Sequence, residues 1–483
     1  MFYLYVLIFC SFLIGQDVYG GYTLFSPGGM SSDNLSYLVD VDGTVYNSWR
    51  HESGPASMPY LYPGEEPGFE NTLLYYPCKV NNPSMNTGGV GGKVEIYNWE
   101  GDKLWEFELS DNTYQHHHDI DVLPNGNILM IAWERKYASD WESMGRNSVN
   151  NSLNQMWSTA ILEIEPNLVT GEAEIVWEWH LWDHLIQDRG SNYNAFYGEI
   201  SDHPELMDIN CGNVGASGSP GSQSNGDWMH FNAIDYNSYL DQIVLSSRFQ
   251  NEIYIIDHST TTEEAATHSG GNSGMGGDFL YRWGNPQNYG RGDSSNRILL
   301  GQHGVNWIEE DYPGRGNLLI FNNEHSLNSS AVIEIITPVN QNGNYDIIDD
   351  NPFGPFEIYW QYEDEFFAGR QSGAFRLING NTLITEADNS LIFEVTEQGQ
   401  VVWEYEFPEQ NVMIARADKY GYDFFSTSQI LGDVNGDEFV NVIDVICTVN
   451  VVLGIDSFVE SADINSDGNV NVVDVVYLVD IIL

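Results

Sequence analysis

The chain has 483 residues, and its 70 acidic residues against 17 Lys and Arg give a formal net charge of −53. A field of this sign repels phosphate backbones and anionic lipids, so neither nucleic acid nor a membrane surface is expected as a partner. The length allows one large domain and a small one. Because cations are scarce, any anionic substrate must be held by a local cluster of hydrogen-bond donors.

The N-terminus begins with an apolar run, FYLYVLIFCSFLIG, that is followed by small and polar residues. This run is shorter than the roughly 20 apolar residues of a membrane-spanning helix, and it predicts a secretory signal peptide over residues 1–20. No other stretch predicts a membrane span, so we expect a secreted protein, extracellular or periplasmic. The cysteines after the signal permit at most one internal disulfide, and Cys78 with Cys211 is the expected pair.

The central part of the chain has the composition and patterning of an all-β protein, with many short apolar alternations and 47 glycines. An apolar–Trp step recurs at Trp49, Trp105, Trp177, Trp283, Trp360 and Trp403. A fuller unit predicts four strands, as in HHDIDVLPNG, NILMIAW, TAILEIEP and AEIVWEW. Six such units predict a six-bladed β-propeller over residues 21–430, in which residues 411–430 return to complete the first blade.

Three of the expected innermost strands begin with a histidine at the same position. These are His118 in QHHHDIDV, His230 in DWMHFNAID and His303 in GQHGVNW. Strand alternation directs all three toward one end of the central channel, and it turns the neighbouring His117 away. A single histidine at such a place is more often structural, whereas three in register favour a functional site. Three further histidines, His180, His184 and His203, lie in a long insertion and are expected on its outer surface.

The second strand of each blade runs back antiparallel, so its last residues should lie beside these histidines. The residues expected there are Arg135 beside His118, Arg248 beside His230, and Asn322 and Asn323 beside His303. Asn232 shares the channel-facing side of its strand. Imidazoles surrounded by guanidinium and amide donors form a pocket that suits an oxyanion. Arg376 is a further candidate that would equally suit an ion pair between blades.

Several motifs together resemble the bacterial arylsulfate sulfotransferase family, over roughly residues 34–410. They include HHDIDVLPNGNILMI, DWMHFNAIDYN, GGDFLYRWGNPQNYGRG, GQHGVNWI and NGNTLITEADNSLIFEV. The resemblance implies a propeller that moves a sulfuryl group from a phenolic sulfate ester to a phenol acceptor. It also implies a sulfohistidine intermediate and no nucleotide sulfate donor. Matched by motif, the functional histidines of the family correspond to His230 and His303.

One position departs from the family pattern, because the residue that matches the family's sulfated histidine is Ser372. We therefore expect His303 or His230 to be the nucleophile. The expected catalytic residues are His230, His303, His118 and Arg248, and the expected substrate-binding residues are Arg135, Asn232, Asn322, Asn323, Ser372 and Arg376. A non-catalytic propeller that binds sulfated or acidic glycans remains an alternative, as does a metal-dependent lyase or hydrolase at the channel mouth.

The last fifty residues carry two acidic loops, DVNGDEFVNVID and DINSDGNVNVVD, each followed by an apolar stretch that predicts a short helix. Oxygen side chains at loop positions one, three, five, nine and twelve match the pattern that surrounds Ca²⁺. The expected ligands are Asp433, Asn435, Asp437, Asn441 and Asp444, and Asp463, Asn465, Asp467, Asn471 and Asp474. The repeats resemble a type I dockerin module over residues 431–483, which implies Ca²⁺ and a cohesin-like or cell-surface partner. Two departures are Glu438 in place of glycine and Asp instead of Glu at position twelve; acidic turns without metal are the alternative.

Overall fold

The computed structural model describes residues 18–29, 33–64, 68–215, 224–409, 411–425, 431–432, 434–435, 440–455, 460–465 and 469–482. The signal peptide predicted over residues 1–20 therefore lies almost wholly outside the described residues, as do the expected calcium ligands Asp433, Asp437 and Asp467. Within the described parts, no helix is long and apolar enough to cross a membrane. The chain divides into two compact units, and the smaller one consists of Pro63–Thr72 and Gly421–Leu483.

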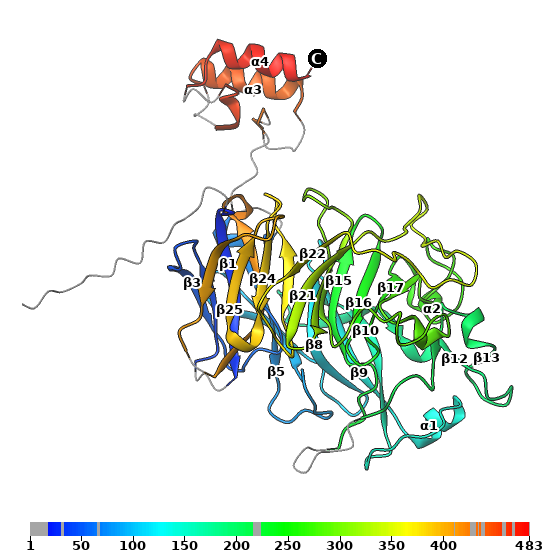
Figure 1. The fold of residues 1–483 in the computed structure, drawn as a ribbon. Helices are drawn as coiled ribbons and strands as arrows, with labels where there is room; N and C mark the ends of the chain where they lie inside the picture. The colour runs from blue at the N-terminus through cyan, green and yellow to red at the C-terminus, as the bar shows by residue number, and fades with distance from the viewer. Residues whose placement is uncertain are drawn as a thin grey trace, which may run out of the picture. The chain divides into compact units, whose positions relative to one another are not determined.

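Six four-stranded antiparallel sheets confirm the predicted six-bladed propeller (Figure 1). Blade 1 contains β27 (Val412–Gly421), β1 (Gly21–Gly29), β2 (Leu35–Val39) and β3 (Val45–Arg50). Blade 2 contains β4 (Tyr60–Tyr62), β5 (Leu73–Lys79), β6 (Gly92–Tyr97) and β7 (Lys103–Glu108). Blade 3 contains β8 (Tyr114–Val122), β9 (Ile128–Lys136), β10 (Met156–Pro166) and β11 (Ala173–His180).

The remaining blades repeat this order, and their first strands contact one another in succession from β8 onward, as the inner strands of a propeller do. Blade 4 contains β15 (Phe231–Asn237), β16 (Gln242–Ser247), β17 (Glu252–Asp257) and β18 (Tyr281–Trp283). Blade 5 contains β19 (His303–Trp307), β20 (Leu318–Ser326), β21 (Ser329–Ile335) and β22 (Trp360–Glu363). Blade 6 contains β23 (Gly373–Arg376), β24 (Thr382–Glu386), β25 (Leu391–Val395) and β26 (Val401–Glu406).

Short elements connect the blades and build the smaller unit. The α-helices are α1 (Ala138–Ser143), α2 (Thr262–Ala265), α3 (Val442–Val452) and α4 (Val472–Ile482). A three-stranded sheet consists of β13 (Phe196–Tyr197), β12 (Leu185–Gln187) and β14 (Met207–Asp208). The 3-10 helices are η1 (Phe69–Asn71), η2 (Leu181–Asp183), η3 (Ile200–Asp202), η4 (Pro286–Tyr289), η5 (Ala387–Asn389), η6 (Tyr422–Phe425) and η7 (Glu460–Ala462).

The recurring tryptophans hold each blade to the next one. Each lies in the fourth strand of its blade, and its Nε1 donates to an oxygen in the connection between the third and fourth strands of the following blade, at 2.7 to 3.2 Å. Trp49 bonds to Asn98, Trp105 to Glu172, Trp177 to Thr260, Trp283 to Pro355, Trp360 to Glu397 and Trp403 to Val41. Because the last bond returns to blade 1, the six interblade hydrogen bonds form a closed ring. Pairing of β27 with β1 closes the ring a second time, because it joins the C-terminal strand to the first strand of the chain within blade 1.

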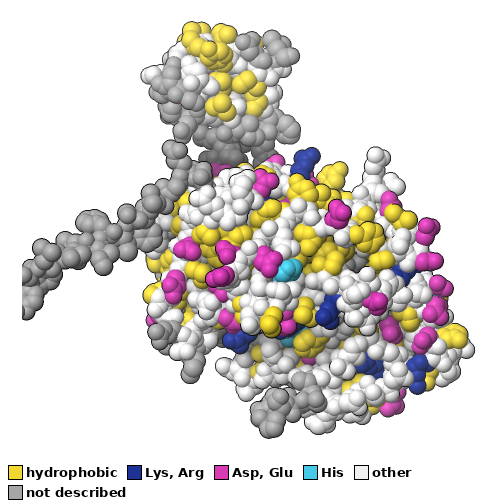
Figure 2. Space-filling view, in the orientation of Figure 1, with side chains coloured by type: hydrophobic (Ala, Val, Ile, Leu, Met, Phe, Trp, Pro, Cys, Tyr) yellow, Lys and Arg dark blue, Asp and Glu magenta, His cyan; other side chains and the backbone are white. Residues whose placement is uncertain are grey.

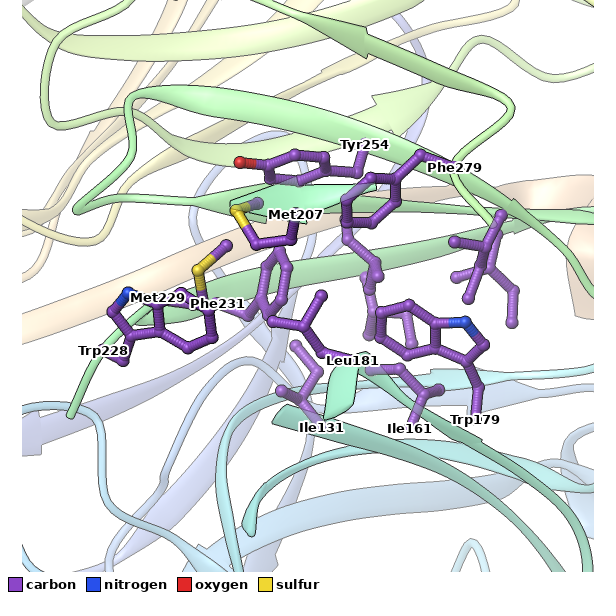
Figure 3. Packing of buried hydrophobic residues seen from close by; sticks show 14 of the residues in the cluster. Ile131, Ile161, Trp179, Leu181, Met207, Trp228, Met229, Phe231, Tyr254 and Phe279 are labelled. Atoms are coloured by element: carbon purple, nitrogen blue, oxygen red, sulfur yellow. The ribbon is translucent and has the colours of Figure 1, made fainter. Parts of the chain in front are cut away.

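The insertion between β11 and β15 packs into the core between blades 3 and 4 (Figure 3). The insertion supplies Leu181, Met207 and Trp228, which pack with Ile131, Ile161, Phe231 and Tyr254 of the two blades. His184 of this insertion is fully buried, so its predicted place on the outer surface is wrong. The apolar residues that flank it bury this part of the chain instead of leaving it as a surface loop.

The predicted disulfide between Cys78 and Cys211 is wrong, because both thiols are free. Cys78 is buried in blade 2, whereas Cys211 lies in the insertion between blades 3 and 4 and donates from Sγ to Oε1 of Gln250 at 3.2 Å. Burial raises the pKa of the Cys211 thiol to about 12. Neither cysteine is therefore a reactive thiolate at neutral pH.

Acidic side chains are spread over the visible face of the propeller, where basic ones are few (Figure 2). Some of the few basic residues are buried in ion pairs. Examples are Arg282 with Glu252 at 2.7 Å and Lys419 with Glu394 at 2.7 Å. Arg416 is likewise buried in contact with Asp119. Each pair removes one basic and one acidic side chain from the surface. The ratio of acidic to basic side chains is therefore higher on the surface than in the whole chain.

The smaller unit contains the two predicted helices after the acidic loops. Helix α3 is capped by Asn441, whose side chain accepts from the backbone N–H of Ile443 at 2.8 Å. Oδ2 of Asp444 accepts from the backbone of Asn441 at 2.8 Å, and Oδ2 of Asp474 accepts from Asn471 at 2.8 Å. The same residues thus end each loop and start each helix.

His258 joins blade 3 to blade 4, and its contribution should depend on pH. Nδ1 lies 2.8 Å from Oδ1 of Asp241, and Nε2 lies 3.0 Å from Oε2 of Glu163. Burial opposes the charged ring, but the hydrogen bonds and charges of both carboxylates outweigh it and raise the pKa of His258 to about 9. Because the pKa of His258 is raised on folding, the charged ring stabilises the folded state fully at pH values below its ordinary pKa of 6.5. This stabilisation is lost as the pH rises through about 9.

We therefore expect His258→Gln to lower the free energy of unfolding by on the order of 2 kcal/mol at pH 6, with the deficit shrinking steadily toward pH 10. Urea unfolding at a series of pH values measures this difference. His203→Gln is the matched control, because His203 pairs with Glu205 at 2.8 Å on the same half of the propeller but is more exposed. A deficit for His258→Gln that does not change with pH would contradict the ion-pair assignment.

Candidate active site

The backbone is irregular where the three predicted histidines begin their strands. His118 and His230 have φ angles of 56° and 52°, and Gly304, next to His303, has a φ of 58°. The pairing of β8, β15 and β19 with the second strands of their blades shifts register at or directly after each histidine. A left-handed non-glycine residue costs about 1–3 kcal/mol, and a β-bulge re-aims the side chain that it carries. Blades 3, 4 and 5 therefore share the same backbone irregularity at the start of their innermost strands.

This irregular backbone brings the histidine rings together. The ring centroids of His118 and His230 are 4.6 Å apart with an interplanar angle of 77°. His303 and Arg248 are close enough to His118 that their charges lower its pKa, and the charges of Arg248 and His230 lower the pKa of His303. All three imidazoles are at least nine-tenths buried. The structure therefore gathers His118, His230, His303 and Arg248 into one cluster, as predicted.

Hydrogen bonds fix the proton of His303 on Nδ1. Nδ1 lies 2.8 Å from Oδ1 of Asn323 and 3.1 Å from the carbonyl oxygen of Gly301. The amide of Asn323 cannot be reversed without loss, because its Nδ2 donates to the carbonyls of Ala368 at 2.9 Å and Gln371 at 3.0 Å. Two acceptors face Nδ1, so Nδ1 carries the hydrogen of the neutral ring and Nε2 carries the lone pair.

A hydrogen bond with Asp227 likewise fixes the orientation of the His230 ring. Oδ2 of Asp227 makes a short hydrogen bond with Nδ1 of His230, and Oδ1 accepts from Nε1 of Trp133 at 3.0 Å. A carboxylate in this position can stabilise a protonated imidazole. Asp227 was not among the predicted residues, although its place three residues before His230 in DWMH was visible in the sequence.

The environment keeps two of the rings neutral. Burial is the largest effect that lowers the pKa of His303 well below its ordinary range, and the charge of Arg248 adds to it. Burial and the neighbouring His230 lower the pKa of His118 in the same direction. At neutral pH His303 is therefore a neutral imidazole with an available lone pair, which is the state that a nucleophile requires.

A cation and an aromatic ring flank the histidines. The backbone N–H of Arg248 donates to the carbonyl of His230 at 3.2 Å, which confirms the predicted adjacency. The guanidinium donates to the carbonyl of Gly369 at 3.1 Å and lies 3.6 Å from Glu324. The next residue, Phe249, stacks on His230 with centroids 4.6 Å apart and is 46% exposed. Phe249 was not among the predicted residues, and it offers an aromatic surface beside the imidazoles.

Comparison with known proteins matches residues 78–422 to the family model of Arylsulfotransferase (ASST). The chain belongs to the arylsulfotransferase family. Membership supports arylsulfotransferase activity, and the family implies an aryl sulfate donor and a phenol acceptor. Residues 431–483 match the Dockerin type I domain, a class of module that generally binds calcium, occurs in extracellular proteins and implies a cohesin partner. No curated protein matches this chain.

Three solved structures that match the arylsulfotransferase chain are at most 12% identical to it. A protein of unknown function from Bacteroides caccae is 10% identical with a TM-score of 0.42, and the match covers 83% of this chain and 98% of that one. A putative 6-phosphogluconolactonase from Bacteroides fragilis is 10% identical with a TM-score of 0.36, covering 84% and 99%. An inactive virginiamycin B lyase from Staphylococcus aureus is 12% identical with a TM-score of 0.34, covering 83% and 88%.

His117 does not point away from the arylsulfotransferase site, contrary to the prediction. Its ring stacks on Trp133 with centroids 4.0 Å apart, and its Nδ1 lies 2.8 Å from Nδ1 of His118. Strict alternation fails here because the register of β8 shifts between His116 and Ile120. His117 therefore supports the ring of His118.

Two residues whose side chains were expected to face the histidines make other contacts. Arg135 is opposite Thr113, beyond the bulge, and its guanidinium donates to the carbonyl of Ser84 at 2.7 Å. The extra residues in β8 displace the register, so Arg135 does not reach back to His118. The side chain of Asn322 holds the backbone before His303, because it accepts from Leu300 at 2.8 Å and donates to Ile298 at 3.1 Å.

The other predicted substrate-binding side chains already have protein partners. Asn232 donates to the carbonyl of Gln302 at 2.7 Å and so positions the segment before His303. Oγ of Ser372 accepts from the backbone of Ala387 at 3.0 Å. Arg376 forms an ion pair with Glu334 of blade 5 at 2.5 Å and stacks over Trp360 at 4.9 Å, as the alternative of an interblade pair predicted.

In the dockerin module, the described part of the first loop presents a buried carboxylate of the type that calcium requires. Oδ1 of Asp444 accepts from the backbone N–H groups of Val434 at 2.8 Å and Asn435 at 3.2 Å. Burial would raise its pKa, but these N–H groups and that of Asn441 outweigh burial and lower it. Asp444 is therefore ionised, and it fits the position-twelve ligand of a Ca²⁺ loop. Asp474 is buried at the equivalent place in the second loop.

Proposed function

We propose that the propeller transfers a sulfuryl group from a phenolic sulfate ester to a phenol acceptor through an N-sulfohistidine at Nε2 of His303. The observation that carries this assignment is the fixed tautomer of His303, whose Nδ1 faces the acceptors Asn323 and Gly301. Burial and the charge of Arg248 lower the pKa of His303 and keep the ring neutral. His230, paired with Asp227, acts as the general acid and base.

In the first step, Nε2 of His303 attacks the sulfur atom of the aryl sulfate. The S–N bond forms as the S–O bond to the aryl group breaks, and the leaving oxygen takes the proton from Nε2 of His230. The charge of Arg248 stabilises the sulfuryl oxygens in a loose transition state, as positioned cations do in phosphoryl transfer. The exposed part of Phe249 provides an aromatic surface for the aryl group.

In the second step, the acceptor phenol gives its proton to Nε2 of His230, and its oxygen attacks the sulfur atom. The S–N bond breaks, so that His303 is again neutral and His230 again carries a proton. Asp227 holds His230 in one orientation throughout both steps. A route through Ser372 has less support, because its hydroxyl is already engaged by the backbone of Ala387.

Incubation of the purified chain with a chromogenic aryl sulfate, with and without a phenol acceptor, tests the activity itself. We expect acceptor-dependent release of the chromogenic phenol that persists in the presence of a chelator. Binding of an aryl sulfate or acidic glycan without turnover would favour a binding propeller. Turnover that stops on chelation and returns with metal would favour a metal-dependent lyase or hydrolase.

Replacement of Asp227 by asparagine should lower the turnover number by about 10²–10⁴-fold, because the amide no longer stabilises the imidazolium of His230. Steady-state kinetics with the aryl sulfate measures the loss. The matched control is Glu205→Gln, which weakens the ion pair between His203 and Glu205, whose atoms are 2.8 Å apart. This pair lies in the insertion after blade 3, so the variant should leave turnover unchanged. Equal activity of Asp227→Asn and the unmodified chain would remove His230 from the acid–base role.

We also propose that residues 1–20 direct secretion, residues 21–430 form the catalytic domain and residues 431–483 attach it to a cohesin-like or cell-surface partner. Apolar side chains of α3 and α4 support this role, since Val442 of α3 and Val472 of α4 are each 66% exposed and Ile446 of α3 is 58% exposed. An apolar helical face of this kind suits a protein partner. Co-elution of the full chain with a cohesin domain in the presence of Ca²⁺ tests the attachment.

A further inference from the structure

A second cluster of metal-ligating side chains lies outside the inner strands of the propeller. His184 follows η2 in the insertion after blade 3, and His268 and Asp278 lie in the connection between β17 and β18 of blade 4. Nδ1 of His184 is 2.7 Å from Oδ1 of Asp278, and Nδ1 of His268 is 2.8 Å from the same oxygen. The three ligand atoms all lie within 4.8 Å of one another. No step of the proposed sulfuryl transfer uses these residues.

The hydrogen bonds of His184 require a cation at its Nδ1. Its Nε2 lies 2.9 Å from the carbonyl oxygen of Ala265, which can only accept, so Nε2 carries a hydrogen. A neutral imidazole has one ring hydrogen, and Nδ1 would then direct its lone pair at a carboxylate oxygen. Either an additional proton or a metal ion must lie between Nδ1 and Asp278. Metal-bound histidines characteristically donate their other ring N–H to such a carbonyl.

The surroundings hold the ring of His184 in a fixed place. Trp179 lies parallel to it, with an interplanar angle of 3°, and donates from Nε1 to the carbonyl of Gly277 at 2.7 Å. A Cβ atom at position 277 would lie 2.1 Å from the carbonyl oxygen of Ala265 and 2.6 Å from Nε2 of His184. Only glycine therefore permits this approach. Trp179 itself is anchored in the core that Figure 3 shows.

The donor set suits a divalent transition metal ion of the Zn²⁺ class. Two imidazole nitrogens and one carboxylate oxygen, with water as the fourth ligand, match the three-ligand tetrahedral sites of zinc. Bond lengths of about 2.0–2.1 Å place tetrahedral ligand atoms about 3.4 Å apart, so the two hydrogen-bonded contacts need to open by about 0.6 Å. The side chain of His268 is 53% exposed and can open its own contact with Asp278. The contact between Asp278 and the fixed ring of His184 opens when the carboxylate turns.

We propose that His184 Nδ1, His268 Nδ1 and Asp278 Oδ1 bind one Zn²⁺ ion that fastens the insertion after blade 3 to blade 4. Zn²⁺ binding to histidine and carboxylate ligands competes with protons in general. The oxygen-rich dockerin loops prefer Ca²⁺, and the two kinds of site differ in ligand chemistry. This site is independent of the chemistry at the channel.

The test uses the full chain, dialysed against Zn²⁺ in the presence of saturating Ca²⁺, followed by metal analysis and thermal unfolding. We expect the unmodified chain to retain one more equivalent of Zn²⁺ than His268→Ala, and Zn²⁺ to raise the melting temperature of the unmodified chain alone by several degrees. His203→Ala is the matched control, because it removes another partly exposed histidine paired with a carboxylate. It should behave like the unmodified chain.

Co²⁺ provides a second measurement that does not depend on stability, since a tetrahedral site with nitrogen ligands gives visible absorption bands. These bands should appear in the unmodified chain and in His203→Ala, and they should be absent in His268→Ala and Asp278→Asn. Because His268 is exposed, its variant should unfold at the same temperature as the unmodified chain when Zn²⁺ is absent. Equal Zn²⁺ content of His268→Ala and the unmodified chain, or no bound Zn²⁺ in either, would overturn the proposal in favour of a protonated ion pair.

Discussion

Replacing His303 by alanine should lower turnover of the aryl sulfate by more than about 10⁴-fold, beyond the about 10²–10⁴-fold that loss of a general acid–base group costs. The reason is that His303→Ala removes the atom that receives the sulfuryl group, so both half-reactions lose their shared intermediate. Steady-state kinetics measures the loss. Tandem mass spectrometry of the chain incubated with donor alone should locate the added sulfuryl group on His303.

The comparison of variants separates the nucleophile from the acid–base group. His230→Ala should still accumulate the sulfuryl adduct on His303, although slowly, whereas His303→Ala should carry none. The matched control is His325→Ala on the second strand of the same blade, where the ring lies 3.6 Å from Glu363 and is partly exposed. It should keep full activity. An adduct on Ser372 or His230, or turnover in His303→Ala, would assign the nucleophile elsewhere.

The propeller was predictable because its strongest sequence signal has a direct structural cause. Each of the six recurring tryptophans makes the same hydrogen bond to the next blade, and a contact repeated at every blade interface leaves a repeat in the sequence. The insertion after blade 3 lacks this repeat. Its burial depends on long-range packing of Leu181, Met207 and Trp228, which alternation along a single strand does not reveal.

The positions of the histidines were predictable, but the directions of their neighbours were not. Alternation with a period of two assumes an extended strand, and the left-handed residues His118 and His230 break that assumption where the site lies. The adjacent bulges then moved Arg135 away from the histidines and turned His117 toward His118. Irregular backbone concentrates at functional sites, so the simple pattern fails there first.

Removal of Ca²⁺ should unfold the dockerin module and leave the propeller folded. Asp444 and Asp474 are buried carboxylates whose oxygens face the loop backbone. The sequence adds further acids at the expected ligand positions of both loops. Without a cation these charges repel one another, and the free energy of metal binding that supports the fold is lost. Limited proteolysis should therefore cleave the chain within residues 431–483 when a chelator is present, and protect it when Ca²⁺ is restored.

Asp474→Asn separates metal binding from the rest of the module, because it keeps the shape of the side chain and removes one buried negative charge. We expect it to need a higher Ca²⁺ concentration for protection, by about tenfold or more, since each carboxylate ligand contributes to the affinity of such a loop. A chain that ends near residue 428 is the internal control for catalysis, and it should turn over aryl sulfate at the unmodified rate in both conditions. Equal proteolysis of the full chain with and without chelator would mean that the acidic loops hold their fold without a metal ion.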